Sequence, residues 1–230
     1  MQSIIIAILM IFSTISIYMV MASIYKRYSY PVFIPVLTST IIIVALLAGL
    51  HVPYKEYMTG GKWIHFLLGP AVTALAYPLY TQREVLKKYS LPVLGGVFTG
   101  LFTGMITGML FAMLLGMNHE LILSLIPKSI TTPVAMQIAD GIGGIPSMTV
   151  IFVTLAGFSG VLLGPSIIKW VRIRSSLGRG IALGSASHGL GTSKASEYGE
   201  ISVSMSSVSM TLCALLGSVF GPVVVWLFHI

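Results

Sequence analysis

Long apolar runs, separated by short polar segments, make up most of this chain. A helix needs about 20 apolar residues to cross the hydrocarbon core of a bilayer, and several runs reach this length. The pattern therefore predicts an all-α polytopic membrane protein with about six full transmembrane helices. We place these helices at about 3–25, 32–50, 63–81, 91–116, 146–168 and 202–229.

The third run differs from the others because it contains Gly69-Pro70 and Pro78. Proline lacks a backbone N–H, and its ring crowds the preceding turn of a helix. We therefore expect the 63–81 helix to be kinked. The first run, up to Tyr25, is expected to be a retained span because no basic leader precedes it.

Two stretches, 119–144 and 176–200, are less apolar and contain turn-forming residues near their centres. Residues 127–133 read Pro-Lys-Ser-Ile-Thr-Thr-Pro, and the two prolines prevent a continuous helix. Residues 187–194 read Ser-His-Gly-Leu-Gly-Thr-Ser-Lys. Backbone that is not helical is tolerated at membrane depth where it is buried in protein or lines an aqueous path. Both stretches are therefore predicted to be re-entrant hairpins or broken helices, of the kind found in transporters.

The basic residues predict the orientation of the chain. Positive residues favour the cytoplasmic side of a membrane. Nine of them fall on that side if the N-terminus is outside and if 119–144 enters the bilayer from outside and returns there, and the outer loops then hold Lys55, Lys62 and His119. The stretch 176–200 then enters from the cytoplasm. The residues concerned are Lys26, Arg27, Arg83, Lys87, Lys88, Lys169, Arg172, Arg174 and Arg179.

A weak internal similarity agrees with two opposed hairpins. Residues 131–165 and 191–222 each run from a threonine-containing segment through an apolar helix to a Gly-Pro pair. An inverted repeat of this kind places two hairpin tips near the bilayer midplane. We accordingly divide the single membrane domain, 1–230, into mainly scaffold spans, 1–116, and hairpin-plus-span units that carry the site, 119–230.

Composition excludes several classes of protein. Hydrophobic residues make up 56% of the 230 residues and charged residues 8%, whereas soluble domains carry about 25% charged residues. The net charge of +7 lies in short loops and does not indicate nucleic-acid binding. The single Cys213 allows no intrachain disulfide, and the histidines lack the spacing of metal ligands. With no nucleophile elbow and no phosphate-binding loop, the chain is not expected to be an enzyme or to hold a metal or cofactor.

The first interrupted segment combines a cation with hydroxyl groups, and this chemistry suits a small carboxylate. Free backbone N–H groups and the helix N-terminus after Pro133 add positive character. The alternative is that the lysine extends to a surface and that the hydroxyls cap helices. The candidate substrate-binding residues here are Lys128, Ser129, Thr131 and Thr132.

The second interrupted segment offers hydroxyls, a histidine and flexible backbone. Glycines permit turns that other residues resist, and a histidine can carry protons because it titrates near neutral pH. The alternative is a cytoplasmic loop with an incidental histidine. The candidate substrate-binding residues here are His188, Gly189, Gly191, Thr192, Ser193 and Lys194.

Two carboxylates and four glycines complete the set of candidates. Asp140 and Glu197 could bind a coupling ion or share proton transfer with His188, pair with Lys194 or Lys128, or lie at solvated ends. Glycines spaced four apart let another helix approach closely, within this chain or from a partner. These glycines are Gly96, Gly100, Gly104 and Gly108.

Several of these motifs resemble those of the LrgB/CidB family of membrane proteins. The motifs are Leu-Gly-Pro-Ala-Val-Thr-Ala-Leu-Ala-Tyr-Pro-Leu-Tyr at 68–80, the segment 127–135, Gly-Gly-Ile-Pro at 143–146 and the segment 184–195. The likeness extends over nearly the whole chain. It departs at Lys194, where arginine is expected, and at 137–140, which is less acidic than expected.

The resemblance implies two competing functions. Bacterial members are commonly described as holin-like or antiholin-like proteins of the cell membrane. They are paired with a smaller LrgA/CidA-type membrane protein and linked to murein hydrolase export, autolysis and programmed cell death. Other members resemble carriers: a plastid relative exchanges glycolate and glycerate, and some bacterial pairs are tied to pyruvate uptake.

We expect a secondary transporter of small monocarboxylates, such as pyruvate, lactate or glycolate, that works by alternating access. The alternative is a holin-like or antiholin-like protein without a substrate of its own. A pore needs helices arranged around a lumen, whereas converging polar segments are typical of carriers. A homodimer is expected because closed two-fold assemblies are the commonest oligomers.

Overall fold

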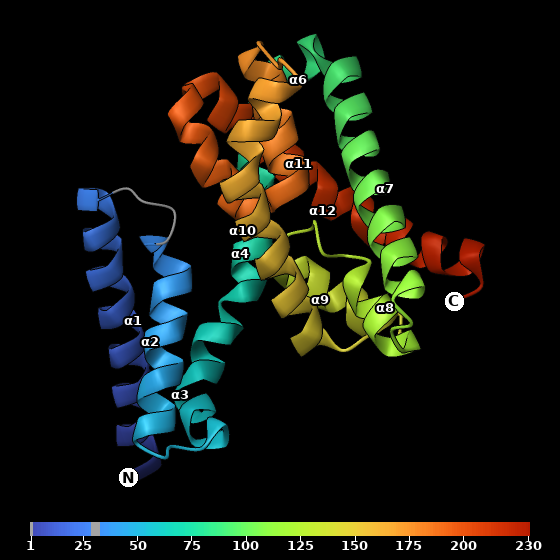
Figure 1. The fold of residues 1–230 in the computed structure, drawn as a ribbon. Helices are drawn as coiled ribbons and strands as arrows, with labels where there is room; N and C mark the ends of the chain where they lie inside the picture. Colours follow the sequence, from blue (N-terminus) through green and yellow to red (C-terminus); the bar gives the residue numbers. More distant parts are fainter. Residues whose placement is uncertain (1, 29–32) are drawn as a thin grey trace. The chain divides into compact units, whose positions relative to one another are not determined.

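The computed structural model describes residues 2–28 and 33–230, which are helical and contain no strand (Figure 1). Among these residues, four helices are long and apolar enough to cross a bilayer. The prediction of an all-α polytopic membrane protein is thus confirmed. Residue 32, the first of the predicted second span, lies outside the described residues. The four helices are α1 (Gln2–Tyr28), α7 (Ser90–Leu114), α10 (Pro146–Trp170) and α12 (Glu200–Phe228).

The chain divides into two compact units, one ending at Ala71 and the other covering Val72–Ile230. In the first unit α1 packs against α2 (Pro35–Gly49) and α3 (Tyr54–Phe66). The Thr14 and Tyr57 hydroxyls lie 3.1 Å apart between α1 and α3. The α2 helix has only 15 residues, so it is shorter than the span predicted at 32–50.

The segment predicted as one kinked span at 63–81 is divided further than expected. It consists of the end of α3, then α4 (Leu68–Ala74) and α5 (Ala76–Thr81). Proline at 70 or 78 offers no N–H to the carbonyl four residues earlier, and the helices end at those carbonyls, on Phe66 and Ala74. The prolines therefore explain both breaks. A further short helix, α6 (Arg83–Lys88), leads into α7.

The first interrupted stretch is a hairpin of two short helices, α8 (His119–Leu125) and α9 (Thr132–Gly141). Ser124, near the end of α8, binds the chain that follows α9: its Oγ accepts from Ile145 N at 2.7 Å, and its carbonyl accepts from Thr149 Oγ1 at 3.0 Å. The chain after α9 thus returns to α8, as a hairpin requires, and its path relative to the bilayer stays a prediction.

The second interrupted stretch, α11 (Ser176–Ala195), also turns back on itself. Its helical geometry breaks at His188, where φ is 43° and ψ is −130°. Beyond this point Ala195 packs against Leu183 of the first arm. After the short 3₁₀ helix η2 (Ser196–Tyr198), Ser202 Oγ donates to Ser176 O at 2.9 Å, so entrance and exit of the hairpin lie together.

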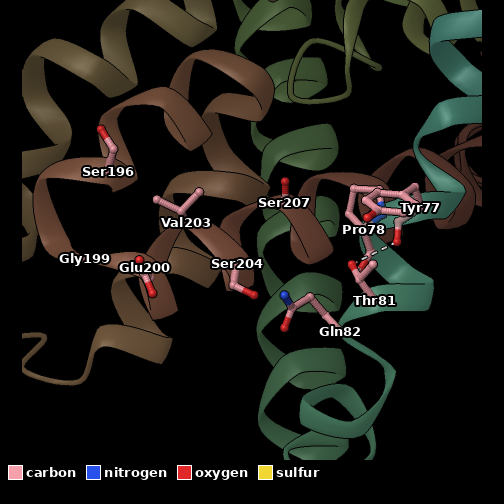
Figure 2. Close-up of a pocket in the computed structure, with 10 residues that line it drawn as sticks. All are labelled: Tyr77, Pro78, Thr81, Gln82, Ser196, Gly199, Glu200, Val203, Ser204 and Ser207. Atoms are coloured by element: carbon pink, nitrogen blue, oxygen red, sulfur yellow. Dashed lines mark hydrogen bonds between the residues drawn. The ribbon is translucent and has the colours of Figure 1, made fainter.

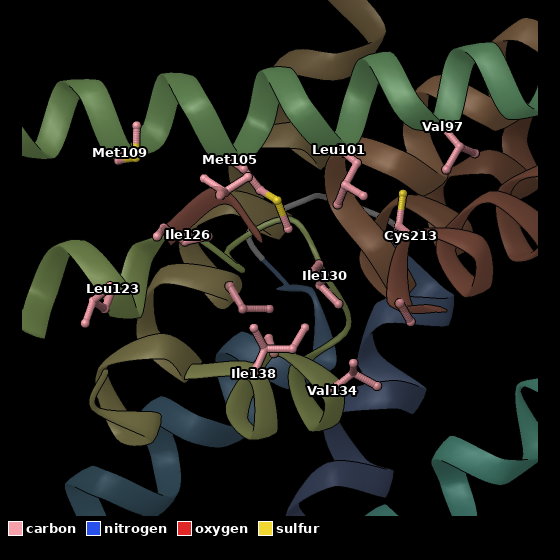
Figure 3. Close-up of a cluster of buried hydrophobic side chains, with 14 of the residues drawn as sticks. Val97, Leu101, Met105, Met109, Leu123, Ile126, Ile130, Val134, Ile138 and Cys213 are labelled. Carbon is pink, nitrogen blue, oxygen red and sulfur yellow. The ribbon is translucent and has the colours of Figure 1, made fainter. Parts of the chain in front are cut away.

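The core of the second unit forms where one face of α7 meets the hairpins and α12. This face carries large apolar side chains at every fourth position, as a helix buried on one side requires. In Figure 3 the labelled side chains of α7 point toward Ile126 and Ile130 of the first hairpin and Cys213 of α12. The fully buried α7 residues are Val93, Val97, Leu101, Met105 and Met109.

The boundary between the compact units lies at Ala71–Val72, and α7 packs with α8, α11 and α12 in the second unit. The functional division at 116–119, between scaffold and moving hairpins, stays a prediction.

Candidate functional site

Both hairpins pack against the glycines of α7. A Cβ atom added at Gly96 would lie 2.7 Å from Ile181 Cγ2, and one at Gly100 would lie 2.8 Å from Ser185 Oγ. These contacts come from the first arm of α11. The absence of side chains on this face of α7 therefore allows α11 to approach closely within the same chain.

The next two glycines contact the first hairpin instead. A Cβ atom at Gly104 would lie 3.0 Å from Ser129 Oγ and 3.9 Å from Lys128 Nζ, and one at Gly108 would lie 2.7 Å from Lys128 Cε. Gly100 and Gly104 lie close to the middle of α7. The two interrupted segments thus approach the middle of one spanning helix from opposite ends.

Contacts with α12 place the segments in the same way. A Cβ atom at Gly189 would lie 3.9 Å from Met210 Sδ, and one at Gly217 would lie 3.1 Å from Ile130 Cγ1. Met210 and Gly217 flank the middle of α12, which runs from Glu200 to Phe228. The contacts with α7 and those with α12 therefore agree: the two hairpin tips lie on either side of the middle of these helices.

Lys128 is the one cation of the first segment, and it is partly buried. Its Nζ donates a long hydrogen bond, 3.5 Å, to Ser129 Oγ. In the part of the chain that the structure describes, no carboxylate lies within 4.0 Å of this ammonium group. A cation at this depth without a counter-ion favours an anionic ligand, since an unpaired charge is costly away from water.

The hydroxyls beside Lys128 do not serve as helix caps. Thr131 is the N-cap residue of α9, yet its side chain makes no capping hydrogen bond. Ser129 is 7% exposed, and its Oγ accepts the Lys128 bond. Thr132 begins α9, with Pro133 following. The four candidates of this tip, Lys128, Ser129, Thr131 and Thr132, thus lie within five residues that lead into the N-terminus of α9.

The second tip is arranged differently from the expectation. The turn is made by His188 and not by Gly189 or Gly191, which do not have positive φ. Gly191 is required for another reason: an added Cβ would overlap the carbonyl oxygen of Leu183 in the first arm. The glycine at 191 therefore permits close packing of the two arms, and the histidine carries the unusual backbone.

The polar groups of the second tip have partners within the protein. His188 Nε2 donates to Val153 O on α10 at 3.0 Å. Thr192 Oγ1 donates to His188 O at 3.1 Å and lies 3.0 Å from Ser206 Oγ on α12. Ser193 is exposed, and its carbonyl accepts from Ser196 Oγ. A ligand would thus meet this tip through backbone groups or through rearranged hydroxyls.

The remaining charged candidates lie away from the tips. Lys194 Nζ is 2.7 Å from Glu197 Oε1, near the end of the returning arm of α11. Asp140 is exposed, near the end of α9. The structure thus pairs Glu197 with Lys194, which is one of the alternatives left open by the sequence, and it does not bring Lys194, Glu197 or Asp140 to Lys128.

The sequence analysis missed a second set of close helix contacts. On α10, a Cβ atom at Gly157 would lie 2.8 Å from His188 Nε2, and one at Gly160 would overlap Ser187 Oγ. On α11, Cβ atoms at Gly180 and Gly184 would overlap backbone carbonyls of α12. Small residues at spacings of three and four were the available signal.

A cavity of about 510 Å³ lies between α5 and the start of α12 (Figure 2). Its walls carry Tyr77, Gln82, Glu200 and Ser204, and neither Lys128 nor His188 lines it. Ser204 Oγ is buried there and has no hydrogen-bond partner within the described part of the chain. Because both hairpin tips lie elsewhere, we do not count this cavity as part of the candidate site.

A family model described as the LrgB-like family matches residues 14–227 of this sequence. The chain belongs to the LrgB-like family. It is 66% identical over 230 residues to the uncharacterized protein YxaC of Bacillus subtilis, with both chains fully covered. It is 37% identical over 211 residues to the uncharacterized protein YwbG of the same organism, covering 92% of this chain and 94% of that protein.

Two further relatives are named holin-like proteins. This LrgB-like chain is 36% identical over 223 residues to the holin-like protein CidB of Staphylococcus epidermidis, covering 97% of each chain. The identity to CidB of Staphylococcus aureus is 34% over the same length and coverage. No solved structure matches the chain.

Proposed function

We propose that this LrgB-like protein is a secondary carrier of small monocarboxylates, of the pyruvate, lactate and glycolate class. The observation that carries the proposal is the Lys128 ammonium group, which lies against the middle of α7 and has no carboxylate partner among the described residues. A carboxylate bound there would neutralise this charge. The proposed role involves binding and movement alone, with no catalytic step and no cofactor.

The surroundings of Lys128 suit one carboxylate group. The N-terminus of α9 contributes a positive dipole end, although Pro133 has no N–H and Val134 N already donates to Thr131 O at 3.0 Å. The hydroxyls of Ser129, Thr131 and Thr132 are next to it in the chain and can donate hydrogen bonds. One cation and one helix N-terminus balance one negative charge better than two, which favours monocarboxylates.

Alternating access would follow from the opposed hairpins. Each hairpin ends beside the mid-depth of α7 and α12, so the substrate would lie between the tips. Carriers built in this way move one bundle against another around a fixed site. The second tip, through the backbone near Gly189 and through Thr192 and Ser193, would complete the site. Asp140, Glu197 and His188 stay proposals as ion or proton sites.

A holin-like or antiholin-like function is the second candidate, and the comparisons favour it over the carrier. The specific observation is that relatives at 34% and 36% identity over 97% of the chain are named holin-like proteins. In this role the chain would act in the bacterial cell membrane with an LrgA/CidA-type protein and influence murein hydrolase export, autolysis and programmed cell death. A homodimer is proposed for either function.

Uptake of labelled pyruvate and glycolate into liposomes distinguishes the two functions. The purified chain is reconstituted alone and, in parallel, with an LrgA/CidA-type partner. Saturable uptake that unlabelled carboxylates inhibit supports the carrier. Leakage of a larger dye, with no saturable uptake in either preparation, supports the holin-like function and contradicts the carrier.

Lys128→Met is the sharpest variant for locating the site. Methionine retains an apolar stem that can pack on Gly104 and Gly108, while the charge is removed. We expect saturable uptake to be lost with folding and membrane insertion unchanged, and Lys128→Ala to behave similarly. Lys26→Ala is the control, because Lys26 is exposed in the last turn of α1 and lies outside both tips. Normal affinity in Lys128→Met would disprove the assignment.

A further inference from the structure

A groove of about 620 Å³ lies between α7 and the first arm of α11. One wall is formed by Thr99, Gly100 and Thr103, and the other contains Ser175 and Ser185. Ser175 lies in the loop between α10 and α11, whereas Ser185 lies one turn before the break at His188. The groove therefore extends from the loop end of the second unit toward the middle of α7.

The inner end of the groove reaches the neighbourhood of Lys128. Thr103 is its innermost α7 residue, and the next residue, Gly104, is the position whose added Cβ would lie 3.9 Å from Lys128 Nζ. The groove and the candidate site are thus neighbours on the same face of one helix.

Beyond Lys128 the same face of α7 is filled. The stem of Lys128 lies against Gly108, and Leu125 Cδ2 would be 3.7 Å from a Cβ atom added there. Ala112, one turn further along this face, is buried. In the described residues, the seam between α7 and the first hairpin is therefore packed on the side of Lys128 that lies away from the groove.

Positive charge lies beside the outer end of the groove. Arg172 and Arg174 are exposed in the α10–α11 loop, directly before Ser175. A field of this sign concentrates small anions at the entrance of a channel or cleft. The positive charge of the loop and the open groove thus both favour approach of an anion to Lys128 from the α10–α11 loop.

Resting on the carrier function proposed above, we propose that this groove is the route by which a small carboxylate reaches Lys128 from the α10–α11 side. The structure then represents the conformation that is open to that side. Water can wet the groove because the threonine oxygens accept hydrogen bonds even while their hydrogens are donated to the chain. Movement of the first hairpin along α7 would expose Lys128 to the other side.

The competing explanation is that the threonine face of α7 contacts lipid or a second copy. Thr99 Oγ1 donates to Gly95 O at 2.7 Å, Thr103 Oγ1 to Thr99 O at 2.5 Å, and Thr107 Oγ1 to Thr103 O. Hydroxyls satisfied within their own helix are tolerated in hydrocarbon. Exposure alone therefore does not identify an aqueous route, and solvent access has to be measured.

Single cysteines provide this measurement, since the native Cys213 is buried and is replaced by alanine to remove background reaction. Thr99→Cys, Thr103→Cys and Thr107→Cys are each exposed, in liposomes, to a hydrophilic, membrane-impermeant thiol reagent. Thr107 is the matched control, because it has the same residue type and the same α7 face but does not line the groove. Val171→Cys, in the α10–α11 loop, reports which side the reagent has reached.

We expect the thiol reagent to label Thr99→Cys and Thr103→Cys from the side on which it labels Val171→Cys. Thr107→Cys should not react. Pyruvate or glycolate should slow the reaction at Thr103→Cys. An inert Thr103→Cys, or equal labelling of Thr107→Cys, would overturn the route. Labelling of the groove without protection and without saturable uptake would contradict the carboxylate as its cargo, which separates failure of the carrier function from failure of the groove.

Discussion

At the scale of single residues, His188 is held in a conformation that its side chain type rarely adopts. Its φ of 43° with ψ of −130° lies in a region that disfavours residues with a Cβ atom, at a cost of about 1–3 kcal/mol. The ring is buried, and Nε2 donates to Val153 O on α10. The strained residue, His188, thus also holds the hairpin turn against α10 through its side-chain hydrogen bond.

Two substitutions separate these contributions. His188→Ala and His188→Gly both lose the hydrogen bond and the buried ring, but glycine accommodates positive φ without steric cost. We therefore expect His188→Ala to lower the unfolding temperature in detergent more than His188→Gly, with a difference near 1 kcal/mol in unfolding free energy. Equal destabilisation by the two variants would mean that the turn is not strained at this residue.

At the scale of secondary-structure elements, close contacts between helices decide how the second hairpin is held. Gly184 on α11 faces the backbone carbonyl of Ser206 on α12, which an added Cβ would overlap. Gly189, a few residues further along α11, has only Met210 Sδ at 3.9 Å from such a Cβ. A backbone carbonyl cannot move aside as a flexible methionine side chain can. An added methyl group is therefore less tolerated at position 184 than at position 189.

Gly184→Ala is accordingly expected to destabilise the protein by about 1–3 kcal/mol, because α11 and α12 must separate. Gly189→Ala is its control in the same hairpin, and we expect it to be near neutral or slightly stabilising for folding. Thermal unfolding in detergent, followed by helical circular dichroism, measures both. Similar stability of the two variants would contradict the α11–α12 packing described above.

Much of the element order could be predicted from the sequence, because apolar length and proline position are local signals. The two hairpins followed from interrupted runs, and the α7 glycines followed from their spacing of four. Which helix each glycine meets depends on tertiary packing, so Gly157 and Gly160 of α10 were missed. The break of 63–81 into separate helices was underestimated for the same reason, since neighbouring packing decides whether a proline kinks or ends a helix.

For the candidate site, the lysine and hydroxyls of the first tip are adjacent in sequence, so their grouping was predictable. The position of Lys194 was not, because the depth of a residue within a hairpin depends on where the chain turns. The flanking glycines suggested a turn at 189 or 191, and the structure places it at His188. A backbone strain supported by a distant hydrogen bond, here to Val153, leaves no local signal in the sequence.

At the scale of the whole molecule, the second unit has one strongly basic end. Lys88, Tyr89, Ser175 and Ser176 line one cavity, so the α6–α7 and α10–α11 connections lie at the same end. Helix α6, the last turn of α10 and the α10–α11 connection hold most of the positive residues of the second unit, and the positive-inside tendency predicts that this end faces the cytoplasm. The basic residues concerned are Arg83, Lys87, Lys88, Lys169, Arg172 and Arg174.

This asymmetry predicts the orientation of α10 and, with it, the side from which each hairpin enters. Val171→Cys and Ser147→Cys, at opposite ends of α10, leave every charge in place, and both positions are exposed. In vesicles of known orientation that carry the Cys213→Ala background, an impermeant thiol reagent should label Val171→Cys from the cytoplasmic side and Ser147→Cys from the outside. Labelling of both from one side would mean that α10 does not cross the membrane, which would remove the opposed entry of the hairpins. Exchange of the two sides would keep the opposed hairpins but reverse the orientation, so the groove would then open outward and the basic loop would attract anions from outside the cell.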